Sequence, residues 1–294
     1  MSLPGSLVEC LAKHLSDHLA RPVDIEECVV VGGGSINDAY RLETNEGRYF
    51  VKVNQADRYP SFFAAEADGL GRIGATSTMR VPRVIAVGED HDDSYLLLEW
   101  IASGPKTPAF WSDFGRSLAA LHRHTAPAFG LERDNYIGTL VQRNTEHPGW
   151  TEFFVQCRLE PMVAKARDRK RLGGGDVLRF ERLYAQLDAL FPTEAPALLH
   201  GDLWNGNFMC GADAKPVLID PAVYHGHREM DIAMSTLFGG FDPGFIAAYD
   251  DAWPLEQGWR ERVDLCNLYP LLVHVNLFGG GYVQQVQAVL KRFT

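Results

Sequence analysis

The sequence predicts an α+β fold in two lobes, and three observations point to it. Short apolar runs typical of strands gather within residues 1–101. Residues 102–294 instead carry apolar side chains at helical spacing, as over 110–121 and 177–190. A break that contains glycine and proline, at 102–105, separates the two patterns. We therefore expect an N-terminal lobe around an antiparallel sheet, a larger and mainly helical C-terminal lobe, and a cleft between them.

The first lobe should begin with a helix over 6–20, because leucines recur there at every fourth position. Strands are expected over 29–31, 39–42 and 49–53, joined by turns at 32–34 and 45–47 into an antiparallel meander. A second helix should run from about 60 to 73, and two further strands should follow over 83–88 and 94–101.

Glu66 lies on the apolar stripe of that second helix, four residues after Phe62 and four before Leu70. A lone buried carboxylate is costly, so a partner is expected. Lys52, between two valines on a predicted strand, is the obvious partner. A half-buried pair of this kind adds little stability, but it can point an ammonium at phosphate oxygens. A partly exposed surface ion pair explains the same residues equally well.

The second lobe should be helical over 110–121, over 177–190 and again from about 259, with interruptions at Pro270 and at 278–282. Between these helices, residues 197–199 are expected to form a buried strand that leads into a polar loop. Turn residues at 211–213 and Pro216 should then let the apolar run 217–219 fold back as a hairpin.

Three polar residues of this region form an ordered set: Asp202, Asn207 five residues on, and Asp220 at a strand end. Any one of them alone would more often close a turn or cap a helix. Together they parallel the catalytic loop and metal ligands of phosphoryl-transfer enzymes of the protein-kinase type. Asn207 and Asp220 suit Mg²⁺, which leaves Asp202 to act as the base. His200 is expected to be a buried histidine that holds the loop.

A glycine turn lies between the first two strands and consists of Gly32, Gly33, Gly34 and Ser35. It follows the pattern of neither a Rossmann fingerprint nor a Walker loop. Alone it is an ordinary flexible turn, but with Lys52 downstream it becomes a plausible lid over ATP phosphates. The backbone of Glu99, Trp100 and Ile101, where the lobes join, is expected to pair with an adenine edge.

The composition limits the partners. Hydrophobic residues make up 46% of the 294 and charged residues 22%, as is ordinary for a globular protein. The formal charge of −10 disfavours nucleic acids and anionic membranes as partners, so a phosphate ligand would need a local basic site or a metal. Five cysteines without a close pair favour a reducing compartment. With no signal peptide and no apolar run of membrane-spanning length, we expect a cytoplasmic protein.

Segments spread over nearly the whole chain resemble the fructosamine/ketosamine-3-kinases: 32–37 (GGGSIN), 200–207 (HGDLWNGN), 219–224 (IDPAVY), 226–231 (GHREMD) and 276–282 (NLFGGGY). The His-Gly-Asp loop is shared with aminoglycoside phosphotransferases and choline kinases. The residue Trp204 and the segments 220–224 and 228–231 point more narrowly to ketosamine kinases.

The resemblance implies a protein-kinase-like fold and ATP-dependent phosphorylation of the sugar 3-hydroxyl of ketoamines, a deglycation repair activity that uses ATP and Mg²⁺. The residues 1–101 would form the nucleotide-binding lobe and 102–294 the catalytic and substrate-binding lobe. Carried onto this chain, it makes Asp202 the catalytic base, Asn207 and Asp220 the metal ligands, and Lys52 with Glu66 the phosphate clamp.

Three further residues receive roles from the resemblance. Asp231 would brace the catalytic loop, and Trp204 would either stack on the acceptor or belong to the core. Some relatives carry a redox-active cysteine where Ser35 stands, so we expect no redox switch at this loop.

Two other functions are compatible with the sequence. In the first, the protein phosphorylates an aminoglycoside, choline or a similar alcohol. In the second, it is a catalytically silent nucleotide-binding scaffold. The acceptor sugar, the choice between a free and a protein-bound ketoamine, and the oligomeric state are not fixed by the sequence.

Overall fold

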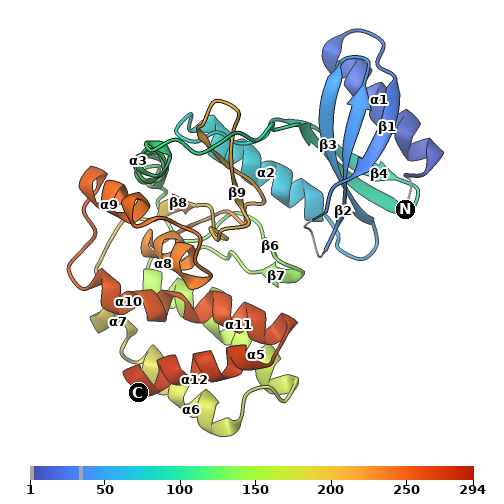
Figure 1. Ribbon diagram of the computed structural model, residues 1–294. Helices are drawn as coiled ribbons and strands as arrows, with labels where there is room; N and C mark the ends of the chain where they lie inside the picture. The colour runs from blue at the N-terminus through green and yellow to red at the C-terminus, as the bar shows by residue number, and fades with distance from the viewer. Residues whose placement is uncertain (1–2, 33–35) are drawn as a thin grey trace. The chain divides into compact units, whose positions relative to one another are not determined.

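The computed structural model describes residues 3–32 and 36–294 (Figure 1). The chain divides into two compact units, and each is described by itself. The first unit comprises Met1–Thr107 and Met209–Asp220, and the second comprises Pro108–Phe208 and Pro221–Thr294. The nucleotide-binding and catalytic roles expected for residues 1–101 and 102–294 stay predictions.

The first unit is built on a five-stranded antiparallel sheet in the order β1-β2-β3-β5-β4. Its elements follow the expected order: α1 (Gly5–Leu19), β1 (Ile25–Val30), β2 (Asp38–Thr44), β3 (Gly47–Gln55), α2 (Phe62–Ala75), β4 (Val84–Asp90) and β5 (Asp93–Glu99). The meander predicted from turn residues is therefore confirmed.

The two helices of this unit pack on opposite faces of the sheet because side chains alternate along a strand. Tyr95 and Leu97 of β5 join the apolar cluster that contains the leucines of α1, whereas Leu96 and Leu98 join the cluster that contains Phe63 of α2. The same alternation turns Val51 and Val53 toward α1. It therefore directs the side chain between them toward α2.

A short hairpin completes the first unit. The two-stranded sheet of β9 (Phe208–Cys210) and β10 (Pro216–Leu218) has the turn that the sequence predicts, closed by a hydrogen bond from the Gly211 amide to the Lys215 carbonyl over 2.9 Å. The amide of Gly104 donates to the carbonyl of Cys210 over 2.9 Å, so the chain that leaves β5 is tied to this hairpin.

The second unit is mainly helical around one large apolar core. Its helices are α3 (Phe110–His122), α4 (Trp150–Phe153), the π-helix η1 (Phe154–Leu159), α5 (Glu160–Asp168), α6 (Gly174–Tyr184), α7 (Leu187–Leu190), α8 (Glu229–Leu237), α9 (Pro243–Ala252), α10 (Trp259–Cys266), α11 (Leu268–Leu277) and α12 (Gly281–Phe293). Two antiparallel pairs accompany them, β6 (Asn135–Ile137) with β7 (Leu140–Gln142) and β8 (Ala197–Leu199) with β11 (Tyr224–Gly226).

One expected interruption is wrong. Pro270 does not break a helix, because it lies in the first turn of α11, where its missing N–H leaves no intrahelical hydrogen bond unmade. The helical tail is instead broken at Asn267, between α10 and α11, and at 278–280, between α11 and α12.

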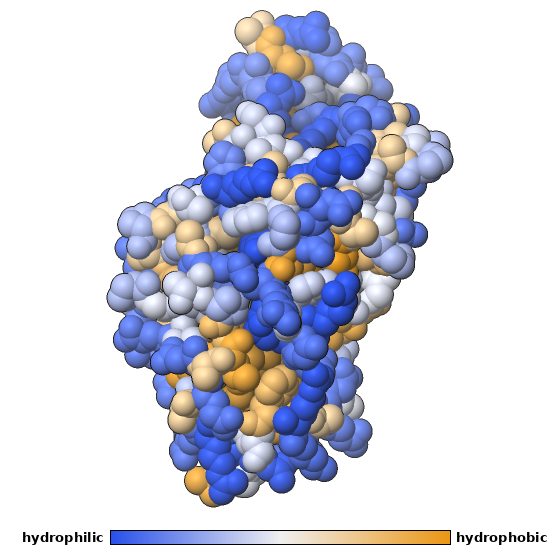
Figure 2. Space-filling model, turned by 90° about the vertical axis from the view of Figure 1, so that its left-hand side faces the viewer, coloured by the Kyte–Doolittle hydropathy of each residue, from blue (hydrophilic) through white to orange (hydrophobic). Residues whose placement is uncertain are grey.

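The surface drawn in Figure 2 is largely hydrophilic, with an apolar area on its lower part, at the height of α10 to α12 in Figure 1. All five cysteines are free thiols. Over the described part of the chain, no helix combines the length and apolar character needed to cross a membrane.

Candidate active site

Lys52 of β3 makes two ion pairs within the first unit. Its Nζ lies 2.7 Å from Oε1 of Glu66 on α2 and 2.5 Å from Oδ1 of Asp220, two residues after the end of β10. The side chains of Lys52 and Glu66 are only 8% and 9% exposed, so the predicted pair is present and is not a surface ion pair. Asp220 as a second partner of Lys52 was not expected from the sequence.

Burial and charge act in opposite directions on this group of residues. Burial alone would lower the pKa of Lys52, but the carboxylates of Glu66 and Asp220 outweigh it and raise the pKa above its usual value. Burial raises the pKa of Glu66, and the ammonium opposes that rise. Lys52 is therefore a fixed cation at neutral pH.

Asp220 has a backbone conformation that few residues other than glycine adopt. Its φ of 54° lies in the left-handed region, which aspartate tolerates better than most side chains. Such conformations tend to occur where function requires them. The side chain is 44% exposed, and only its Oδ1 is joined to Lys52, so an oxygen remains accessible to a ligand.

The predicted nucleotide segments are only partly described. Gly33, Gly34 and Ser35 lie outside the described residues, and Gly32 precedes them on an irregular stretch. Glu99 ends β5, where its carboxylate accepts from Arg80 over 3.2 Å. Trp100 and Ile101 follow the strand, the latter buried. The adenine-binding role of these three residues remains a prediction.

The loop predicted to be catalytic, residues 200–207, lies in the second unit, directly after β8. The side-chain amide of Asn207 donates to the Asp202 carbonyl and to its Oδ2, each over 2.9 Å. The two residues five apart in sequence are thus joined, and the Asp202 carboxylate is oriented by this contact. For Asn207, no hydrogen bond to its Oδ1 is found among the described residues.

Asp231 of α8 holds the start of this loop. Its two carboxylate oxygens accept the backbone N–H groups of His200 over 2.7 Å and Gly201 over 3.0 Å, and His122 lies 3.2 Å away. Burial alone would raise the pKa of Asp231, but His122 and His200 lower it. The predicted brace is therefore confirmed, as is the buried position of His200, whose Nδ1 accepts the Asp202 N–H over 3.2 Å.

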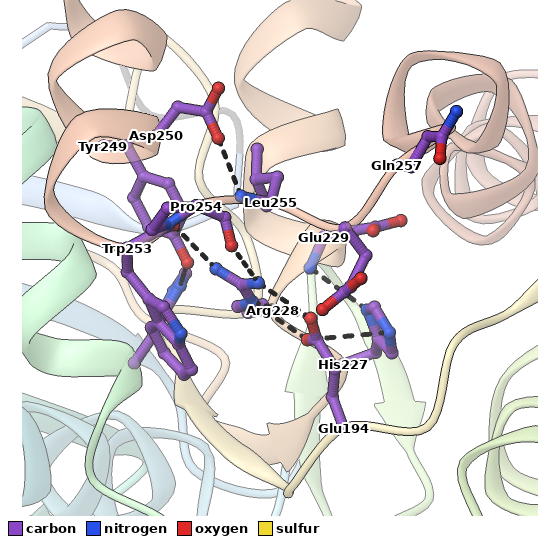
Figure 3. Close-up of polar contacts among 12 residues, drawn as sticks. Glu194, His227, Arg228, Glu229, Tyr249, Asp250, Trp253, Pro254, Leu255 and Gln257 are labelled. Atoms are coloured by element: carbon purple, nitrogen blue, oxygen red, sulfur yellow. Dashed lines mark hydrogen bonds and ion pairs between the residues drawn. The ribbon is translucent and has the colours of Figure 1, made fainter.

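The residues before Asp231 anchor α8 to its surroundings, as Figure 3 shows. Arg228 forms a forked pair with Glu194 and donates to the carbonyls of Trp253 and Pro254 over 2.9 and 2.7 Å. Glu229, one residue on, pairs with Arg262 over 2.6 Å. These buried contacts fix the end of the helix that carries Asp231.

Trp204 is 38% exposed and therefore not a core residue. Its ring lies against Gly206, where an added Cβ would approach it to 2.4 Å, so a larger residue at 206 would displace the ring from this position. Beyond it, ring contacts continue through a set that we call the aromatic row: Trp204, Phe238, His274, Phe278 and Tyr282. Apart from Trp204, this row was not predicted, because it joins residues from three distant segments.

Oxygen atoms within each unit suit Mg²⁺. Asp220 in the first unit offers a carboxylate and Asn207 in the second offers an amide oxygen, and both are hard ligands of the kind that Mg²⁺ takes. Within residues 3–32 and 36–294, no three histidine, cysteine, aspartate or glutamate side chains gather around a common point. A bound cation would therefore draw further ligands from phosphate and water.

Comparison with known proteins supports this picture. The family model for fructosamine kinases matches residues 7–294. A protein of Enterococcus faecium named "probable ketoamine kinase" is 43% identical over 269 residues, which cover 90% of this chain and 94% of that protein. The chloroplastic protein-ribulosamine 3-kinase of Arabidopsis thaliana is 37% identical, with 90% and 81% covered.

Two solved structures extend the comparison to the fold. A candidate fructosamine-3-kinase from Thermobifida fusca superposes with a TM-score of 0.84 at 39% identity and covers 95% of this chain and 98% of its own. Aminoglycoside phosphotransferase APH(4)-Ia superposes with a TM-score of 0.64 at 15% identity, with 96% and 98% covered. At that identity the likeness concerns the fold alone, and it confirms the predicted α+β, protein-kinase-like fold.

Proposed function

The chain belongs to the fructosamine kinase family, and from this premise we propose that it transfers the γ-phosphoryl group of ATP to the sugar 3-hydroxyl of a ketoamine. The proposal is supported by the family membership together with two groups of hydrogen-bonded polar side chains. The first group is Lys52, Glu66 and Asp220, and the second is Asp202 and Asn207. Its biological role would be deglycation repair, because the phosphorylated adduct is unstable and releases the amine.

The first polar group is suited to the phosphates of ATP. Lys52 keeps its charge, and Glu66 holds the ammonium from the side of α2. Phosphoryl transfer involves little covalent work by the protein, and it depends on positioning and charge stabilisation. A cation held in a fixed direction meets that requirement, whereas a mobile surface lysine does not.

The second polar group is suited to the acceptor. Asp202 would accept the proton of the sugar hydroxyl as its oxygen attacks the γ-phosphorus, and the bond to the β-phosphate oxygen breaks. Asn207 would keep the Asp202 carboxylate in place through its side-chain amide. Asp231 would keep the loop backbone in place through His200 and Gly201.

Asn207 and Asp220 would hold Mg²⁺ through their side-chain oxygens, and the bound ion would supply positive charge to the transferring phosphate.

The aromatic row is proposed as the acceptor side of the site. A ketoamine carries a sugar and a secondary ammonium, and aromatic faces bind both sugar C–H groups and cations. Burial lowers the pKa of His274, and its Nδ1 lies 2.8 Å from the Pro270 carbonyl, so this nitrogen is the donor. Its Nε2 is then an acceptor in the middle of the row.

An acceptor screen tests the proposal. The protein is incubated with MgATP and with ribulosamine, erythrulosamine or fructosamine adducts of lysine, and ADP release is followed. An aminoglycoside and choline serve as competing acceptors. We expect at least one ketoamine to be used well above both competitors. If only an aminoglycoside or choline is phosphorylated, the ketoamine assignment is wrong.

A further inference from the structure

Three buried amide side chains, which we call the amide cluster, lie on the β6–β7 hairpin and just beyond it. Its members Asn135, Gln142 and Asn144 are 5%, 0% and 0% exposed. Every polar side-chain atom of the three has a hydrogen-bond partner. A buried amide is costly unless it is satisfied, and a fully satisfied network is rigid.

The cluster holds the backbone that directly follows Asp220 and Pro221. The side-chain nitrogen of Gln142 donates to the Ala222 carbonyl over 3.0 Å, and that of Asn135 donates to the Val223 carbonyl over 2.8 Å. The amide N–H of Ala222 in turn donates to the carbonyl of His200 over 2.9 Å. Gln142 therefore lies two hydrogen bonds from the catalytic loop.

The Ala222 carbonyl also lies in close contact with Gly201 of the loop. A Cβ on Gly201 would lie 2.0 Å from that oxygen, and Gly201 has a φ of 82°. The Ala222 carbonyl therefore lies so close to Gly201 that no side chain fits between them. Because Asp202 is the next residue, the direction of this carbonyl bears on the placement of the base.

Gln142 also forms a hydrogen bond to α11. The hydroxyl of Tyr269, on α11, donates to Oε1 of Gln142 over 2.8 Å. Tyr269 lines a small cavity together with Gly201 and Asp202. At the far end of the cluster, the buried guanidinium of Arg158 donates to Oδ1 of Asn144 over 2.8 Å.

We propose that Gln142 is a positioning residue of the catalytic loop. Its amide holds the Ala222 carbonyl on one side and the Tyr269 hydroxyl on the other, and so sets where Gly201 and Asp202 lie. This inference rests on the proposed role of Asp202 only for its effect on catalysis. Its effect on the loop backbone is independent of any substrate.

Hydrogen exchange tests the effect on the loop. Gln142→Met keeps the length of the side chain without its polar atoms, and Tyr269→Phe removes only a hydroxyl. We expect both variants to exchange the amides of 200–203 about tenfold faster, while exchange in α6 stays unchanged. Tyr184→Phe is the matched control, because the buried Tyr184 hydroxyl has no partner among the described residues. Gln186→Met supplies the same substitution at an exposed position.

Kinetics test the effect on catalysis. For Gln142→Met, kcat per folded molecule should fall about 10²-fold, with KM for MgATP unchanged, because a misplaced base slows the chemical step and not nucleotide binding. A purely structural role would raise exchange everywhere, α6 included, and that result would overturn the proposal. The proposal would also be overturned if Gln142→Met showed the same loop exchange or the same kcat as Gln186→Met. If the wild type phosphorylates no ketoamine, the proposed function fails, and the exchange result alone decides the role of Gln142.

Discussion

The ammonium of Lys52 lies 2.5 Å from Oδ1 of Asp220, a residue 168 positions further along the chain. The hairpin β9–β10 brings this carboxylate to β3, and Glu66 meets the same ammonium from α2. One buried cation thus joins a strand, a helix and a strand end. In the proposed function, this cation provides positive charge for a phosphate of ATP.

Removal of this cation should destabilise the protein. Lys52→Met leaves Glu66 buried without a cation, and the free energy of unfolding should fall by about 3–5 kcal/mol. Glu66→Gln should cost less, because Lys52 keeps Asp220 as a partner. Urea unfolding at pH 7 measures both. Arg72→Met is the control, since the Arg72–Asp68 pair on α2 is partly exposed and should be worth at most about 1 kcal/mol. Equal losses for Lys52→Met and Arg72→Met would contradict the account.

Asp220 should be needed for its charge and not only for its backbone. Asn also tolerates the left-handed conformation, so Asp220→Asn should fold normally. The half-saturating Mg²⁺ concentration for ADP release should rise on the order of 10- to 100-fold, as expected when a charged ligand is lost. Asp213→Asn, an exposed change on the same hairpin, should behave as wild type. An unchanged Mg²⁺ requirement in Asp220→Asn would show that this residue is no metal ligand.

The aromatic row should affect the acceptor and not ATP. Phe278 is the most exposed residue of the row, at 64%. Phe278→Ala should raise KM for a ketoamine by roughly two- to fivefold, because a cation–π contact is lost. KM for MgATP should not change. Leu178→Ala removes another exposed apolar side chain, 55% accessible, from α6 and should change neither constant. A change in KM for MgATP alone would place the row outside the acceptor site.

The Asp231 brace should make stability depend on pH in a defined direction. Its folded-state pKa is lowered, so its contribution is complete above the unfolded value of about 3.9 and is lost as pH falls through the lower folded value. The stability gap between wild type and Asp231→Asn should therefore be about 1–3 kcal/mol at pH 7 and shrink below pH 4. Urea unfolding at several pH values measures it. A gap that stays constant with pH would refute the assignment.

The sequence predicts the sheet and most helices well, because their signals are local. Leucines at every fourth position of α1 and alternating apolar residues of β3 and β5 depend only on the period of the element. The same logic places Glu66 on the buried stripe of α2 and makes Lys52 its partner. Pro270 was misjudged because the start of α11, at Leu268, has no strong sequence signal.

Contacts between distant segments could not be predicted in the same way. The joining of Asp220 to Lys52 depends on the β9–β10 hairpin, which clusters with the first unit. Gln142 lies on a three-residue strand with an exposed neighbour, Val141, and nothing in its local sequence marks it as buried. The aromatic row likewise forms only once three helices or loops of the second unit are folded.

In the proposed reaction, the sugar 3-hydroxyl of a ketoamine is phosphorylated with Asp202 as the base. The direct measurement uses the ribulosamine, erythrulosamine or fructosamine adduct that the acceptor screen identifies as a substrate. Its reaction with MgATP is monitored by ³¹P and ¹³C NMR, with the wild type and with Asp202→Asn. We expect a phosphate on the sugar 3-oxygen, followed by release of the free amine, with the rate reduced about 10²- to 10⁴-fold in the variant. A phosphate on another oxygen, or an Asp202→Asn rate equal to that of the wild type, would disprove the proposed reaction.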